Sequence, residues 1–81
     1  MRVTVLVFAR PREIVGRSQL QLDVPEEATP AAVFGSLARK FPRLRAMQPA
    51  LRCAIDQEYA DWQAPLHDGA ELAFIPPTAG G

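Results

Sequence analysis

The stretch V-T-V-L-V-F at residues 3–8 decides the fold of this 81-residue chain. Successive side chains of a strand point to opposite sides, so its three valines share one face and Leu6 and Phe8 share the other. A strand that is apolar on both faces is usually central in its sheet. We therefore expect neighbouring strands on both sides of residues 3–8.

The residues that follow predict a second strand and a helix. After a connector at Ala9–Gly16, the stretch Gln19–Val24 alternates polar and apolar residues, which predicts a half-buried strand hairpinned to the first. Thr29-Pro30 is typical of a helix N-cap followed by proline at the first helical position. Apolar residues then recur at helical spacing, so the helix is expected to run to about Phe41.

The second half of the chain predicts short elements separated by turns. Expected in order are one short helical turn within Pro42–Pro49, a strand at Arg52–Ile55, a turn at Asp56–Glu58 into a brief strand near Tyr59, a tight turn at Asp68-Gly69, and a last strand at Glu71–Ile75. Pro76-Pro77 ends that strand, because proline has no N–H to donate to a ladder.

This order predicts an α+β, ubiquitin-like β-grasp fold. It is a mixed sheet of about five strands packed on one main helix, with the first and last strands as parallel neighbours. Residues 1–75 form the domain. Residues 76–81 have no apolar anchor, so they are expected to form a flexible C-terminal tail.

Composition excludes several classes of partner. Nine Lys/Arg balance nine Asp/Glu, so no overall field selects nucleic acid or an acidic membrane. All nine basic residues lie at or before Arg52, so residues 1–52 carry a net charge of +5 (9 − 4) and residues 53–81 carry −5 (0 − 5). This asymmetry suits either a charged partner surface or an ordinary solvated one.

The termini and the single cysteine indicate a compartment. One cysteine allows no internal disulfide. The N-terminus lacks a basic segment followed by a long apolar one, and no apolar run approaches the roughly 20 residues that span a bilayer. We expect a cytoplasmic protein with no membrane contact.

Conventional catalytic residues are sparse. His67 lies in a polar turn beside Asp68, where a lone histidine is more often a surface residue than a catalytic one. Cys53 lies inside an apolar strand, where cysteine usually acts as a small hydrophobe. A Cys–His pairing stays open, but no third orienting group is evident.

Cofactor and nucleic-acid signals are also lacking. No cluster has metal-ligand spacing, and there is no phosphate-binding or dinucleotide motif. Tyr59 and Trp62 are not interleaved with basic residues, so nucleic acid is not expected as a partner. We expect the chain alone to be no enzyme and to bind no cofactor or metal.

The remaining candidate is the C-terminus, Gly80-Gly81. Glycines lack Cβ and can pass through a narrow channel. Six residues from Pro76 reach about 20 Å when extended. The Gly81 carboxylate is an anion near neutral pH and needs activation, for which adenylation by ATP is the obvious route. Attack by sulfur would then give a thiocarboxylate, and attack by a lysine would give an isopeptide. The tail alone leaves both open.

Both ends of the chain resemble a known family. The opening V-L-V-F-A-R-P-R-E-I-V-G and the closing L-H-D-G-A-E-L-A-F-I-P-P-T-A-G-G are similar to the MoaD-type sulfur carriers, the small subunits of molybdopterin synthase. The resemblance runs from Val3 to Gly81 and is weaker in the middle. Small departures are Ala70, where an acid is commoner, Asp56, where these carriers often have Asn, and Thr78-Ala79 before the diglycine.

The resemblance implies a non-catalytic subunit that works through its tail. A ubiquitin-activating-like adenylyltransferase would consume ATP to adenylate Gly81, and a sulfurtransferase would convert it to a thiocarboxylate. The tail residues Pro76, Pro77, Thr78, Ala79 and Gly80 would insert into the active site of the large subunit, which supplies the catalytic side chains. The sulfur would go to cyclic pyranopterin monophosphate in molybdenum cofactor biosynthesis, within a heterotetramer.

Resemblance and strand pleat together suggest a docking patch near the tail. It consists of Phe8, Tyr59 and Ile75, with Arg12 at its rim. The residues leave open whether Phe8 and Ile75 are core residues instead.

Three rival functions share these features. One is a sulfur carrier for another pathway such as thiamine biosynthesis, although such carriers are usually shorter. A second is a ubiquitin-like protein modifier. A third is a plain interaction module whose tail is incidental.

Overall fold

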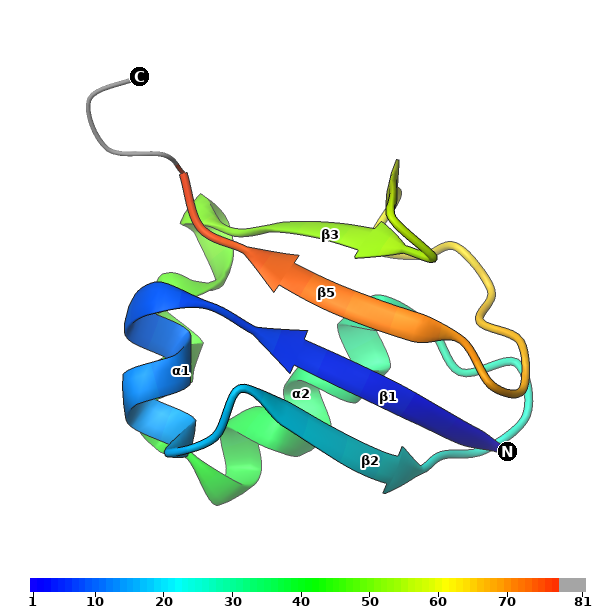
Figure 1. Ribbon diagram of the computed structural model, residues 1–81, viewed down its shortest axis with the longest axis horizontal. Helices are drawn as coiled ribbons and strands as arrows, with labels where there is room; N and C mark the ends of the chain where they lie inside the picture. The colour runs from blue at the N-terminus through cyan, green and yellow to red at the C-terminus, as the bar shows by residue number, and fades with distance from the viewer. Residues whose placement is uncertain (78–81) are drawn as a thin grey trace.

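The computed structural model describes residues 1–77, which form one five-stranded sheet with helices packed on one side and at one end (Figure 1). The elements in chain order are β1 (Arg2–Val7), α1 (Ala9–Val15), β2 (Gln19–Asp23), α2 (Pro30–Lys40), the 3-10 helix η1 (Pro42–Ala50), β3 (Arg52–Ile55), β4 (Glu58–Ala60) and β5 (Glu71–Ile75). Within this part of the chain no helix is long and apolar enough to cross a membrane.

The sheet has the strand order β2-β1-β5-β3-β4. β5 lies parallel to β1, with Thr4 opposite Glu71 and Val7 opposite Phe74, and antiparallel to β3. The pairs β1–β2 and β3–β4 are antiparallel. The predicted mixed sheet, with its first and last strands as parallel neighbours, is confirmed, and so is the β-grasp fold.

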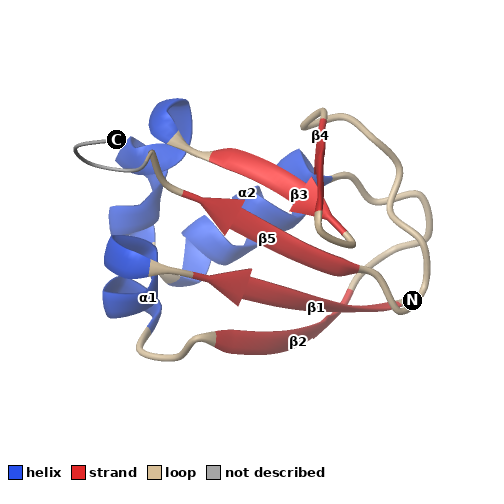
Figure 2. Cartoon of the chain, turned by 45° about the horizontal axis from the view of Figure 1, so that its top comes forward, coloured by secondary structure: helices blue, strands red, loops and turns tan. Residues whose placement is uncertain are grey.

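One face of this sheet holds the core. The three valines of β1 are 0–1% exposed and pack with Leu72 and Phe74 of β5 against α2. Phe74 stacks on Trp62, with ring centroids 5.6 Å apart, and meets Phe34 of α2 edge to face at 5.1 Å. Figure 2 shows α2 crossing behind the strands, on the side of the sheet that holds the core.

α2 begins where the sequence predicts. The Thr29 hydroxyl accepts a hydrogen bond from the Ala32 N–H at 3.2 Å, and Pro30 occupies the first turn. Proline fits there because its missing N–H would have no partner inside the helix. The helix ends at Lys40, one residue before the predicted end.

Two predicted connections are wrong in detail. The expected connector at Ala9–Gly16 contains helix α1, so β1 and β2 pair without a tight hairpin turn between them. Pro11 is the third residue of α1, still in the first turn, and Gly16 caps the helix with a left-handed φ of 85°. The single helical turn expected after α2 is the nine-residue η1.

Candidate functional site

The chain leaves the sheet from its centre. β5 is flanked by β1 and β3, and it ends at Ile75 beside the end of its parallel neighbour β1. Pro76 is half-buried and Pro77 is exposed. The other predicted tail residues, Thr78, Ala79, Gly80 and Gly81, lie outside the described residues, and their roles stay predictions.

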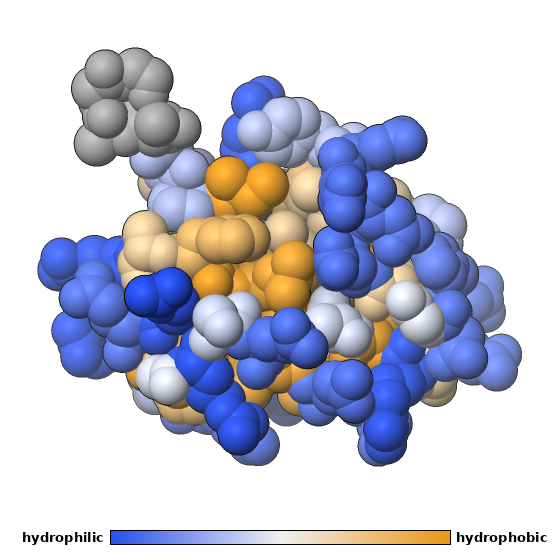
Figure 3. Space-filling view, in the orientation of Figure 1, coloured by the Kyte–Doolittle hydropathy of each residue, from blue (hydrophilic) through white to orange (hydrophobic). Residues whose placement is uncertain are grey.

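An apolar groove runs over the outer face of the sheet, opposite α2. Its floor follows from the strand register, which places Leu6, Ala73, Ala54 and Tyr59 in one row across β1, β5, β3 and β4. Two alanines in the middle of this row, between larger side chains, leave a hollow of about 280 Å³. Apolar side chains gather over these central strands in Figure 3. The groove residues are Leu6, Phe8, Ala54, Tyr59, Ala73 and Ile75, with Gln57 and Glu71 also in its lining.

The structure brings three of the four predicted docking residues together. Phe8, Tyr59 and Ile75 all line the groove. Phe8 is 45% exposed and Tyr59 is 66% exposed, and they are the exposed large hydrophobic residues of the described chain. Phe8 is therefore a surface residue and not a core residue. Arg12 is exposed on α1 and does not line the groove.

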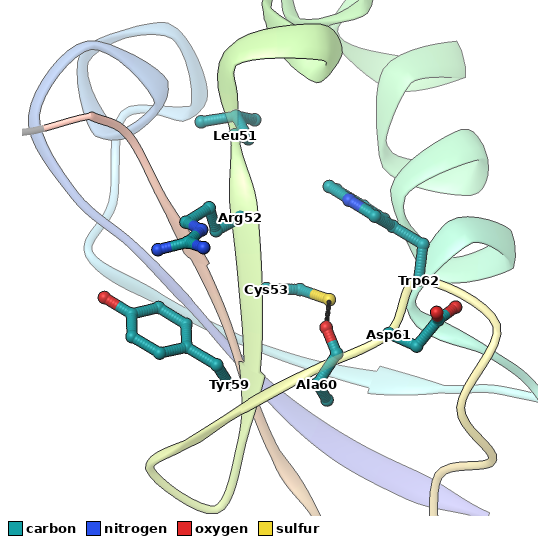
Figure 4. A pocket seen from close by; sticks show the side chains of 7 residues that line it. All are labelled: Leu51, Arg52, Cys53, Tyr59, Ala60, Asp61 and Trp62. Atoms are coloured by element: carbon teal, nitrogen blue, oxygen red, sulfur yellow. Dashed lines mark hydrogen bonds between the residues drawn. The ribbon is translucent and has the colours of Figure 1, made fainter.

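A second hollow of about 500 Å³ lies beside the β3–β4 hairpin (Figure 4). Its rim carries Arg52, whose guanidinium carbon lies 4.8 Å from the centre of the Tyr59 ring, a cation–π contact. Cys53 and Trp62 line its inner side. Tyr59 belongs to both hollows, so the hairpin joins them.

Cys53 has the environment of a structural residue. It is 1% exposed, and its Sγ donates a hydrogen bond to the Ala60 carbonyl at 3.2 Å (Figure 4). Burial raises the pKa of the Cys53 thiol, and the negative charge of Asp61 raises it further. A thiol held neutral in this way is a poor nucleophile.

His67 pairs with Asp56 and not with Cys53. In the protonated ring, Nε2 donates to Asp56 Oδ2 at 2.5 Å and Nδ1 donates to the Asp68 carbonyl at 2.9 Å. These two hydrogen bonds raise the pKa of His67. Asp56 Oδ1 accepts the Glu71 N–H at 3.0 Å, and this bond, followed by the one from His67, lowers the pKa of Asp56. The result is an exposed clasp that ties the β3–β4 turn to the start of β5.

Within residues 1–77, no group of three or more His, Cys, Asp or Glu side chains is placed to hold a metal ion. The features of the described surface that suit binding are the apolar groove and the hollow beside the β3–β4 hairpin.

Comparison with known proteins places the chain in a family. The sequence profile described as the ThiS family matches residues 5–81. The chain belongs to the ThiS family. A relative from Arabidopsis thaliana, named molybdopterin synthase sulfur carrier subunit, is 36% identical over all of this chain and 84% of its own length.

Two solved structures share the fold of this ThiS-family chain. Small archaeal modifier protein 1 of Haloferax volcanii is 22% identical with a TM-score of 0.82, covering 95% of this chain and 98% of its own. The second structure is one chain of the complex of subunits 1 and 2 of the molybdopterin-converting factor of Helicobacter pylori. It is 18% identical with a TM-score of 0.71, and the match covers all of this chain and all of that one. At these identities the likeness shows the fold.

Sequence reasoning about this ThiS-family chain missed part of the groove. Leu6, Ala54 and Ala73 line it, but Ala54 and Ala73 are too small to suggest an exposed apolar site by themselves. The available signal was alternation, since Leu6 shares a face with Phe8 and Ala73 shares a face with Ile75. Joining these pairs needed the register between strands that are far apart in the sequence.

Proposed function

We propose that this chain is the sulfur carrier subunit of a molybdopterin synthase, with the Gly81 carboxylate as the carrying group. The observation that carries the proposal is the family match, which continues through the diglycine to residue 81. The full-length relative from Arabidopsis thaliana, a molybdopterin synthase sulfur carrier subunit, supports the same assignment.

The proposed chemistry has two activation steps. A carboxylate oxygen of Gly81 attacks the α-phosphate of ATP on a ubiquitin-activating-like adenylyltransferase, forming an acyl-adenylate and releasing pyrophosphate. Sulfide delivered by a sulfurtransferase system then attacks the acyl carbon, and AMP leaves as the thiocarboxylate forms. Adenylation is needed because a carboxylate anion is a poor electrophile.

The large subunit then receives the tail. The thiocarboxylate sulfur bonds to cyclic pyranopterin monophosphate, and water then cleaves the resulting thioester, which leaves the sulfur on the substrate and restores the Gly81 carboxylate. The catalytic side chains for this step belong to the large subunit. The groove supports such docking, because it is apolar, open and next to the point where β5 ends at Ile75. Phe8 and Tyr59 are aromatic anchors of the kind that dominate protein–protein interfaces.

Intact mass tests the carrying group. The full chain is incubated with ATP, the activating enzyme and a sulfur source, and a matched chain that ends at Gly80 serves as the control. The expected result is a mass gain of one oxygen-to-sulfur exchange in the full chain and none in the control. No change in the full chain under any of these conditions would sink the proposal.

Two rival functions give different products in the same reaction. A protein modifier, favoured by the fold shared with small archaeal modifier protein 1, would appear as isopeptide-linked conjugates. A carrier for thiamine or another sulfur pathway would form the thiocarboxylate but would not convert cyclic pyranopterin monophosphate when the large subunit is added. Conversion in that last step is the expected result.

A further inference from the structure

The cationic side chains gather at one end of the molecule. Two stand on α1, one on the loop after it, two in the last turn of α2 and two on η1, and all seven are exposed: Arg10, Arg12, Arg17, Arg39, Lys40, Arg43 and Arg45. We call this set the basic end. Figure 1 shows α1, the end of α2 and η1 together at the end of the sheet where β1 and β5 finish. Packing agrees, because η1 contacts both α1 and α2.

The acidic side chains lie mostly at the opposite end. They stand at the end of β2 and on the segment after it, on the β3–β4 turn, on the turn before β5 and at the first residue of β5: Asp23, Glu26, Glu27, Asp56, Asp68 and Glu71. The net charge of zero therefore hides a polarised molecule. The sequence shows two oppositely charged halves, whereas the fold gathers acidic residues from both halves at one end of the molecule.

The basic end has no internal partner within residues 1–77. The ion pairs of this part of the chain are Arg2–Asp23 and His67–Asp56, and neither includes a basic-end residue. Arg10 and Arg43 even share a polar notch of about 270 Å³ between α1 and η1, with Glu13 and Ile14. The Glu13 carboxylate in the same lining forms no ion pair with either guanidinium group, so two positive charges and one negative charge leave the notch with a net charge of +1. A carboxylate from outside would offset that charge.

The basic end adjoins the apolar groove. Phe8 lines the groove and is also the N-cap of α1, so it directly precedes the helix that carries Arg10. The groove, the exit of β5 and the basic end thus form one continuous surface. An apolar centre with a charged rim is the usual anatomy of a protein interface.

We propose that the basic end docks onto an acidic protein surface of the large subunit, beside the channel that receives the tail. This inference rests on the proposed function. Protein is favoured over nucleic acid because the cationic surface is confined to one end, and the acidic opposite end would repel an extended polyanion. Such complementarity mainly accelerates association and suppresses wrong partners.

Association kinetics test the proposal. The variant R10Q/R43Q lowers the net charge by two, and the control Q19E/Q21E lowers it equally at exposed positions of β2. With the large subunit at low salt, we expect R10Q/R43Q to associate about tenfold more slowly than the wild type, and the control to stay within about twofold. The difference should vanish at high salt. Equal rates for wild type and R10Q/R43Q, or equal slowing of both variants, would overturn the proposal.

Two further experiments test the basic end without the large subunit and compare protein with RNA as its partner. Retention on immobilised polyglutamate needs no large subunit, so it tests the basic end even if the proposed function fails. R10Q/R43Q should elute at lower salt than the control, and co-elution of the two would overturn the proposal. Tighter binding of a short RNA than of the large subunit, lost in R10Q/R43Q, would overturn it in favour of nucleic acid. If circular dichroism shows R10Q/R43Q to be unfolded, R39Q/R45Q replaces it.

Discussion

The two faces of the sheet are built from the same strands but serve different purposes. On the inner face, Val5 and Phe74 are 0% and 1% exposed beneath α2. On the outer face, two residues of the same strands line an open groove. They are Leu6, which follows Val5, and Ala73, which precedes Phe74. Strands with apolar residues on both faces therefore do not need a layer of helices packed on each face. One face stabilises the fold, and the other stays open as the proposed docking face.

The largest effect is expected from breaking the inner face. Phe74→Ala removes the stack on Trp62 and the edge contact with Phe34 and leaves a cavity. We expect the free energy of unfolding to fall by about 3–5 kcal/mol. Urea denaturation followed by circular dichroism measures this loss, and a change smaller than that of an ordinary surface substitution would contradict the assigned core.

Breaking the outer face should affect binding and spare stability. Phe8→Lys places a charge beside the groove, and Gln21→Lys on the exposed edge strand β2 is the control with the same added charge. We expect Phe8→Lys to weaken affinity for the large subunit by about 30-fold, equivalent to about 2 kcal/mol. Titration calorimetry measures the affinity. Loss of the fold in Phe8→Lys would show that the outer face is also needed for stability.

The smallest effect is expected at the clasp of His67 and Asp56, which ties the β3–β4 turn to the start of β5. The pKa of Asp56 is lowered, so its contribution is present above its ordinary value of 3.8 and is lost as the pH falls through the folded-state pKa. The pKa of His67 is raised, so its contribution is complete below 6.5 and is lost as the pH rises through the folded-state pKa. Both contributions to stability are therefore present between pH 3.8 and pH 6.5.

Thermal unfolding of the wild type and His67→Gln across this range checks the clasp. The wild type should be the more stable protein at mildly acidic pH, and the difference should shrink as the pH rises past the folded-state pKa of His67. The chain has one histidine, so its imidazole signals in an NMR titration belong to His67. A measured pKa at or below 6.5 would contradict the clasp.

Local signals predicted much of the fold. Thr29-Pro30 marks the start of α2, and the bounds of β3 and β5 agree with the structure. α1 was missed because it spans seven residues, too few for a clear period, and because Pro11 and Gly16 suggest a loop. In the folded chain, the same two residues occupy the first turn and the C-cap, where proline and glycine are favoured.

The candidate site was less predictable, because it depends on pairing between distant residues. The sequence named Phe8, Tyr59 and Ile75, but not which face α2 would cover. The clasp joins Asp56 to a histidine eleven positions away, which no local pattern indicates. The seven cations of the basic end were visible in the sequence, but their convergence depends on the packing of η1 against α1 and α2.

The burial of Cys53 has a practical consequence for labelling. It is the chain's single cysteine, it is 1% exposed, and burial raises the pKa of its thiol. The Cys53 thiol of the native protein should therefore react slowly with a thiol-directed alkylating reagent. Under the proposed function, a label that the folded chain takes up only after activation would report the proposed thiocarboxylate at Gly81, so loading could be followed without mutating the protein.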